Sequence, residues 1–227
     1  MKKAACALLL LAAVNAAAAV SYRLQGSSGM SGRVLVDGAK VRIDLDNGTV
    51  VLTGDSGKTL TLIDPAAKTY TTMSTADLAG GLDMTITNAK SSARDAGDGG
   101  TLENFPTRRW LLDTGFDVNV DAAGQKMTIH VSMHGESWRT DKLPEAAASI
   151  ALGQATRTGV PAIDKVIESV AAANAKGFPL KEVTTIRTTA AGGEEQTTTW
   201  TVEVHDVRTG VAAAPAQFAV PAEYKRK

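Results

Sequence analysis

The sequence predicts a mainly β protein, built from one large antiparallel sheet with one or two helices inserted late in the chain. Three observations support this fold class. Apolar and polar residues alternate with a period of two along most of the chain, and Gly, Asn, Asp and Pro interrupt the alternation at short intervals. Residues 161–176 change to a helical period instead. The sheet and the helix must cover each other's apolar faces, because neither face is stable in water.

The N-terminal segment has the pattern of a secretory signal peptide. Lys2 and Lys3 precede an apolar run of roughly ten residues, which is too short to span a bilayer, and an alanine-rich stretch follows. Ala17 and Ala19 fit the small-residue positions of a cleavage site. We therefore expect residues 1–19 to be a signal peptide that is cleaved near Ala19.

Cleavage would leave residues 20–227 as a single domain, which is long enough to bury a full hydrophobic core. It would also remove Cys6, the only cysteine, and with it any disulfide or cysteine metal ligand. Cys6 lies near the start of the apolar run, whereas a lipid-attachment cysteine follows such a run, so we expect no lipid anchor. No second apolar run approaches transmembrane length, and we expect no transmembrane segment in the mature chain. The near-neutral charge gives no reason to expect a nucleic-acid partner.

The first third of the mature chain predicts a meander of short strands. The segment "RVLVDGAKVRIDLDNG" predicts a hairpin around Asp37-Gly38, and in its second arm Val41 and Ile43 alternate with charged residues. Asn47-Gly48 is a pair that favours the next tight turn. The runs "TVVLT", "KTLTLID" and "TYTTM" then predict three more strands joined by four-residue turns.

Residues 54–57, "GDSG", resemble the loop around the nucleophilic serine of chymotrypsin-like proteases. They join two predicted strands, however, and Asp, Ser and Gly are the residues that turns select. The chymotrypsin chain order is His, Asp, Ser, whereas His130, His134 and His205 all follow Ser56. We interpret Ser56 as a turn residue, and we expect no catalytic residues.

The run "HVSMHGE" places His130 and His134 four residues apart. On a helix this spacing would let both rings share a zinc ion. The surrounding residues alternate and are β-branched, which predicts a strand, and four residues of a strand span about 13 Å. A metal site on either histidine would then need ligands from a neighbouring strand. We interpret both as solvated strand histidines and expect neither a metal nor another cofactor.

Residues 88–104, "NAKSSARDAGDGGTLEN", are rich in Gly, Ser and Asp and show no periodicity. This composition predicts a mobile loop. Asp95 and Asp98 do not have the spacing of an EF-hand, and no bidentate Glu follows where that motif requires one. We therefore expect no calcium site in this segment.

Strands resume at "TRRWLLD", "FDVNVD" and "KMTIHVSMHGESWRTD". In the last of these, Trp138 falls on the His130 face, unless Gly135 forms a bulge that turns Trp138 inward. Two further strands, "PLKEVTTIRTT" and "TTTWTVEVHDV", surround "AAGGEE". In the second of them Trp200 and Val202 share one face.

Residues 161–176 predict an amphipathic helix. Pro161 suits its first turn and Gly177 suits a C-terminal cap. The apolar positions recur at helical spacing and form one stripe: Ile163, Val166, Ile167 and Val170. The preceding "LPEAAASIALG" has similar punctuation and predicts a shorter helix.

Five segments carry a resemblance to a known family: "GKTLTLIDPAAKTYTTM", "NFPTRRW", "GESWRTDKLP", "KGFPLKEV" and "FAVPAEYK". In these segments the chain resembles the periplasmic carriers of outer-membrane lipoproteins, the LolA-like half barrels, and especially their relatives of unknown function. The resemblance implies an unclosed β half barrel with helices packed on its concave face. It also implies a periplasmic location and an acyl chain or other apolar ligand on that face. No position matches a functional motif of the carriers, so no functional residue is transferred.

Two hypotheses about function follow. In the first, the exported protein binds a lipid, a lipoprotein acyl chain or another apolar ligand in the half barrel. The expected lining residues are Val34, Val41, Ile43, Leu60, Leu62, Ile129, Val131, Ile163, Val166, Ile167, Val170 and Trp200. In the second, the protein holds no ligand and is a structural or interaction protein with a partner in the bacterial envelope. An exposed apolar patch or a bare sheet edge would favour the second hypothesis.

We do not expect an enzyme. The sequence shows no paired carboxylates, metal-ligand cluster or nucleophile triad that is compatible with the predicted strands. Aromatic residues make up only 4% of the chain, which argues against a stacking platform for sugars or bases.

Overall fold

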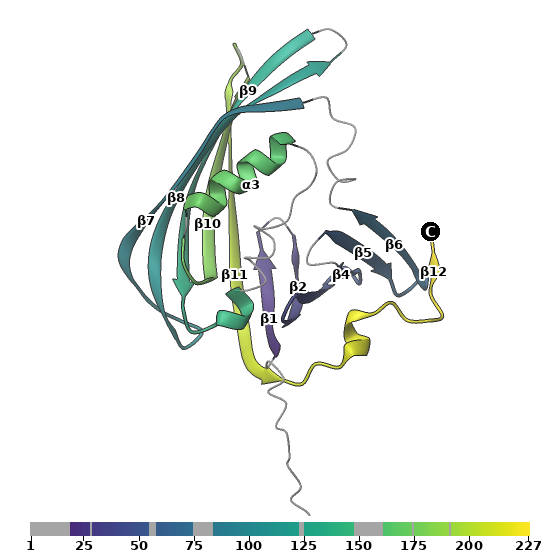
Figure 1. Cartoon of the computed structure of the whole chain (residues 1–227). Coiled ribbons are helices and arrows are strands. Elements are labelled where there is room, and N and C mark those ends of the chain that lie inside the picture. Colours follow the sequence, from purple (N-terminus) through teal and green to yellow (C-terminus); the bar gives the residue numbers. More distant parts are fainter. Residues whose placement is uncertain are drawn as a thin grey trace, which may run out of the picture.

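The computed structural model describes residues 19–27, 29–54, 58–74, 84–122, 125–147, 161–173, 175–190 and 192–227. These residues form one 12-stranded sheet that curves around a helix (Figure 1). Neighbouring strands are antiparallel except for the last short strand, and the two edges of the sheet do not pair with each other. The predicted mainly β fold, an unclosed curved sheet with helices on its concave face, is therefore confirmed.

The strands belong to two meanders. The first contains β1 (Ala19–Gly26), β2 (Ser31–Asp37), β3 (Lys40–Leu45), β4 (Val50–Gly54), β5 (Thr59–Asp64) and β6 (Thr69–Ser74). The second contains β7 (Met84–Leu102), β8 (Phe105–Ala122), β9 (Gln125–Thr140), β10 (Phe178–Ala190) and β11 (Glu195–Val211). The remaining elements are α3 (Pro161–Ala173), η2 (Pro215–Phe218) and β12 (Lys225–Arg226). Strand β1 pairs with β11 and joins the meanders, so that β7 lies at one edge and β12, parallel to β6, lies at the other.

The first meander follows the predicted hairpins. Asp37 pairs with Lys40, so the loop between β2 and β3 has two residues, and Gly38 has a φ of 57° that favours glycine. Gly48 has a φ of 89° in the turn before β4. Strands β4 and β5 are paired up to Gly54 and Thr59, on either side of Ser56. Ser56 itself lies outside the described residues.

The prediction of a mobile loop at residues 88–104 is wrong, because most of this segment belongs to β7. The strand is paired with β8 along its length, with register shifts near residues 87–90 and 95–100. Asx turns explain the unusual composition: Asp95 accepts a hydrogen bond from the Gly97 amide, and Asp98 accepts one from the Gly100 amide, each at 2.8 Å. Both glycines have positive φ angles, so the Gly and Asp residues form bulges in an edge strand rather than a loop.

In the second meander, the strands predicted separately at "TRRWLLD" and "FDVNVD" are parts of β8, because Gly115 continues the pairing opposite Ser132. Strand β9 shows no register shift at Gly135 with β8 or with β10. Without a bulge there, Trp138 stays on the same face as His130, as the strand pattern predicts in the absence of a bulge.

The helix predicted at residues 161–176 is α3, which contacts the edge strand β7 (Figure 1). Residues 144–147 are also helical, and residues 148–160 lie outside the described ranges. The prediction that Gly177 caps α3 is wrong, since the helix ends at Ala173. Gly177 lies in the turn into β10, with a φ of 84°, and a Cβ there would approach the Thr140 carbonyl oxygen to 2.6 Å. None of the helices in the described ranges is long and apolar enough to cross a membrane.

Two apolar clusters lie on opposite faces of the sheet. We call the face that α3 covers the inner face and the other the outer face. Near the chain's first strand, Leu143 and Ala146 pack with Val20, Leu180 and Val204. This cluster closes one end of the inner face.

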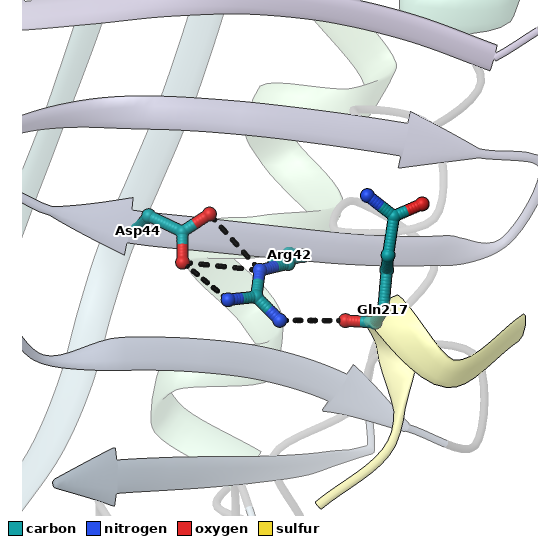
Figure 2. Close-up of polar contacts among 3 residues, drawn as sticks. All are labelled: Arg42, Asp44 and Gln217. Carbon is teal, nitrogen blue, oxygen red and sulfur yellow. Dashed lines mark hydrogen bonds and ion pairs between the residues drawn. The ribbon is translucent and has the colours of Figure 1, made fainter. Parts of the chain in front are cut away.

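The second cluster lies on the outer face, where the C-terminal segment covers the first meander. Val50, Leu52 and Ile63 pack there with Val220 and Tyr224. Figure 2 shows how the segment is held: Arg42 of β3 donates a hydrogen bond from Nη1 to the carbonyl oxygen of Gln217 at 2.9 Å. The end of the chain therefore adds a second layer to this half of the sheet.

Candidate functional site

The cross-strand register places the predicted lining residues of the first meander on one face. Val34 lies opposite Ile43, and both belong to a row that continues through Val51 to Leu62. The two remaining predicted residues, Val41 and Leu60, lie two positions from members of this row and therefore share its face.

The same face continues into the second meander. Trp200 lies opposite Thr184, which lies opposite Gly135. The two predicted residues of β9, Ile129 and Val131, alternate with Gly135 at even spacing and share its face.

A contact with α3 identifies this face as the inner one. Ser91 lies opposite Thr114, which lies opposite Met133, two residues from Val131 on β9. The Ser91 hydroxyl is 2.9 Å from the Thr114 hydroxyl and 2.9 Å from the Ser169 hydroxyl of α3. The predicted sheet residues and the helix therefore lie on the same side of the sheet.

Several apolar side chains on this face remain accessible. Trp200 is 49% exposed, Val170 of α3 is 38% exposed and Leu62 is 36% exposed, whereas Val34 is buried at 3%. Seven further predicted residues are half-buried: Val41, Ile43, Leu60, Ile129, Val131, Val166 and Ile167. The side chain of Ile163 is outside the described set. Apolar surface on the inner face is thus only partly covered.

A cavity of about 990 Å³ borders α3 and strands β7 to β10. Its lining includes Ser91, Thr114, Met133 and Ser169 together with further polar side chains. None of the twelve predicted lining residues is among the described residues around it, although Leu62 borders a smaller pocket of about 150 Å³. Sequence reasoning missed Ser91 because it lies in the segment predicted to be a loop.

The outer face carries the two histidines that suggested a metal site. His130 Nδ1 contacts Asp117, and His134 Nδ1 contacts Asp113 at 2.7 Å, in both cases across the β8–β9 pair. Two hydrogen bonds hold the pKa of Asp117 below its usual range: the larger contribution comes from Asn88 and the smaller one from His130. Each histidine has its own aspartate partner, and within the described ranges no group of three metal-ligating side chains comes together.

A charged ladder on the outer face surrounds Trp138. Arg109 and Lys181 lie over its ring at 5.8 and 5.7 Å from the centroid. Arg109 also pairs with Glu136 at 2.8 Å, and Lys181 with Glu203 at 2.9 Å. The hydrogen bond from Lys181 lowers the pKa of Glu203. These charges are paired with one another, which suits a structural ladder on a solvated face.

Comparisons with known proteins do not assign the chain to a family. A scan against protein-family models finds no match to the chain, and a search of curated proteins finds none either. The LolA-like resemblance therefore rests on the five sequence segments. The curved, unclosed sheet with an inner helix agrees with the fold that the resemblance implies, and this agreement concerns the fold alone.

Proposed function

We propose that the protein is exported to the bacterial envelope and binds a lipid or another apolar ligand on the inner face of the half barrel. One observation carries this proposal. Trp200, Val170 and Leu62 come from three different elements around the inner face, and each keeps more than a third of its surface exposed. Accessible apolar side chains on a concave surface are typical of ligand-binding clefts.

An acyl chain suits such a surface because its binding needs no directional contacts. Each methylene group that leaves water gains about 0.8 kcal/mol. A chain lying between α3 and the sheet would contact Val170 on one side and Trp200 on the other. The half-buried positions Ile43, Val131 and Ile167 would extend the apolar contact along the ligand.

The proposal is tested by native mass spectrometry and solvent extraction of protein purified from its own envelope, followed by titration with a fluorescent fatty acid. We expect co-purified lipid and saturable uptake. Leu62→Glu places a carboxylate on the inner face and should weaken uptake by about tenfold or more. Met30→Glu is the matched control, since Met30 is 60% exposed in the turn before β2 and should leave uptake unchanged.

Two outcomes would contradict the proposal. If well-folded protein yields no lipid and shows no saturable uptake, the apolar-ligand proposal fails. Uptake that Leu62→Glu leaves at the wild-type level would place the ligand away from the inner face.

A second candidate function, an interaction protein of the envelope, is favoured by the position of β7. This strand has 19 residues and lies at the edge of the sheet, where, among the described strands, it pairs only with β8. An unpaired edge offers backbone groups to a partner strand. A photoreactive residue at Arg94 on β7 should then cross-link to another protein in cells, while one at Arg187 on β10, inside the sheet, should not.

A further inference from the structure

A second cavity, of about 530 Å³, lies where β8 and β9 meet the turn between α3 and β10. The indole of Trp110 and the ring of Pro106 give it an apolar wall. Most of its remaining lining is charged and includes Arg139, near the end of β9. None of the residues proposed to bind an apolar ligand is among the described residues that line this cavity.

Arg139 is unusual because its guanidinium is buried, with a side chain only 7% exposed. Its Nε donates a hydrogen bond of 3.1 Å to the carbonyl oxygen of Gly177. Within the described ranges, the nearest carboxylate oxygen is Oε1 of Glu182, 3.9 Å from Nη1, and it already accepts a hydrogen bond of 2.9 Å from Ser137. Among the described residues, the bond to Gly177 is the one hydrogen bond from this guanidinium, which has five donors.

A buried charge with such sparse partners is costly, because water no longer solvates it. Burial lowers the pKa of Arg139, and the charge of Glu182 opposes that effect only in part. Arginine nevertheless stays protonated in proteins, so the charge persists. An anion in the cavity would supply the acceptors that the Nη groups lack.

The other charges around the cavity leave an excess of positive charge. Arg108 is paired with Asp95 at 2.7 Å, and Lys142 lies 3.4 Å from Asp141. Both acidic residues of the lining thus already have a cationic partner. Lys176 is exposed beside the cavity, and no ion pair joins it to the part of the chain that the structure describes. Among the described lining residues, Arg139 and Lys176 are therefore the cations available to a ligand.

We propose that this cavity is an oxyanion-binding site that takes a carboxylate or phosphate group, with Arg139 as its anchor and Lys176 as a second cation. A planar guanidinium binds such groups through two parallel hydrogen bonds. Trp110 would pack against an apolar part attached to the anion. The site differs from the inner-face apolar surface, so the proposal does not depend on the function proposed above.

The site is tested by NMR of the arginine Nε–Hε groups, with the Arg139 resonance assigned by its loss in Arg139→Lys. The protein is titrated with inorganic phosphate and, separately, with dodecyl phosphate below its micelle concentration, against sodium chloride at matched ionic strength. We expect a saturable shift of the Arg139 resonance with phosphate and none with chloride. Tighter binding of dodecyl phosphate would identify a lipid headgroup as the source of the anion, and equal binding would identify a free anion.

Two variants make the result specific. Arg139→Lys keeps the charge but loses the two-point contact, and we expect binding to weaken by about tenfold or more, followed through the backbone amides around Gly177. Lys176→Gln changes an exposed side chain, and we expect it to weaken binding several-fold without affecting folding. This variant therefore tests the site even if Arg139→Lys does not fold. Lys165→Gln, on the exposed side of α3, is the control and should bind as the wild type does.

The absence of a saturable shift with both phosphates would overturn the proposal. A shift that Lys176→Gln leaves at wild-type affinity would also overturn it, because the anion would then bind elsewhere. Binding of inorganic phosphate by a protein that takes up no fatty acid would support this site while removing the apolar-ligand function.

Discussion

Arg42 and Asp44 lie two residues apart on β3, and the Arg42 guanidinium donates hydrogen bonds from Nε and Nη2 to the Asp44 carboxylate at 2.6 to 3.0 Å. This contact raises the pKa of Arg42 and fixes the side chain, so that Nη1 points to the Gln217 carbonyl oxygen. One ion pair on the sheet therefore positions the donor that holds the C-terminal segment (Figure 2).

We expect Arg42→Gln to loosen the C-terminal segment and to lower the free energy of unfolding by about 1 kcal/mol, the usual contribution of a partly exposed hydrogen bond. Hydrogen exchange should speed up at the amides of Gln217 and Ala219. Arg33→Gln, an exposed arginine on the adjacent β2, is the control and should change neither quantity. Unchanged exchange in Arg42→Gln would show that the apolar packing of Val220 and Tyr224 holds the segment alone.

Gly32 should tolerate no side chain. A Cβ at this position would overlap the carbonyl oxygen of Asp44 and lie 2.9 Å from the Cα of Leu45. We expect Gly32→Ala to lower the free energy of unfolding by about 1 to 3 kcal/mol in urea denaturation. Gly115→Ala is the matched control in β8, where a Cβ meets nothing closer than 3.9 Å, and it should be neutral or slightly stabilising. Equal effects of both changes would contradict this account.

Burial raises the pKa of Tyr22 to about 12, and its ring packs edge-on against Phe178. Because the folded-state pKa exceeds the unfolded value of about 10, the resulting stabilisation is present below pH 10 and is lost as the pH rises towards 12. The loss should approach roughly 2 to 3 kcal/mol. Urea denaturation between pH 9 and 12 should show a smaller decline in Tyr22→Phe than in the wild type, whereas parallel declines would assign the alkaline loss to other groups.

The N-terminal pattern predicts that the exported protein begins within a few residues of Val20 and carries no lipid. Intact-mass measurement of the periplasmic fraction provides the test. A mass that retains Cys6 with attached acyl chains would contradict both parts of the prediction and would place the protein on a membrane.

Ser56→Ala should change the free energy of unfolding by no more than about 0.5 kcal/mol, since we interpret Ser56 as a turn residue between two paired strands. A fluorophosphonate probe should not label the wild-type protein. Labelling that disappears in Ser56→Ala would instead reveal a nucleophile.

Local patterns in the sequence were enough to predict the fold class and much of the first meander. Alternation along β3 and the turn pairs around Gly38 and Gly48 are local signals. The structure forms the strand and both turns where these signals predict them. The helical stripe around Val166 likewise predicted α3. Alternation also assigned the sheet residues of the inner face, because the side chains of a strand project to opposite sides at every second residue.

Other features depend on contacts between segments that are far apart in the chain. Strand β7 has almost no apolar alternation, and its extended conformation depends on pairing with β8. No pattern within residues 84–102 predicts that pairing. No local pattern in "SWRTDKLP" indicates that Arg139 is buried. It is buried because the turn at Gly177 packs against the end of β9. Its contact with Gly177 joins residues 38 positions apart in the chain. Burial and charge balance at such a site depend on which segments meet, and that is a property of the folded chain rather than of any stretch within it.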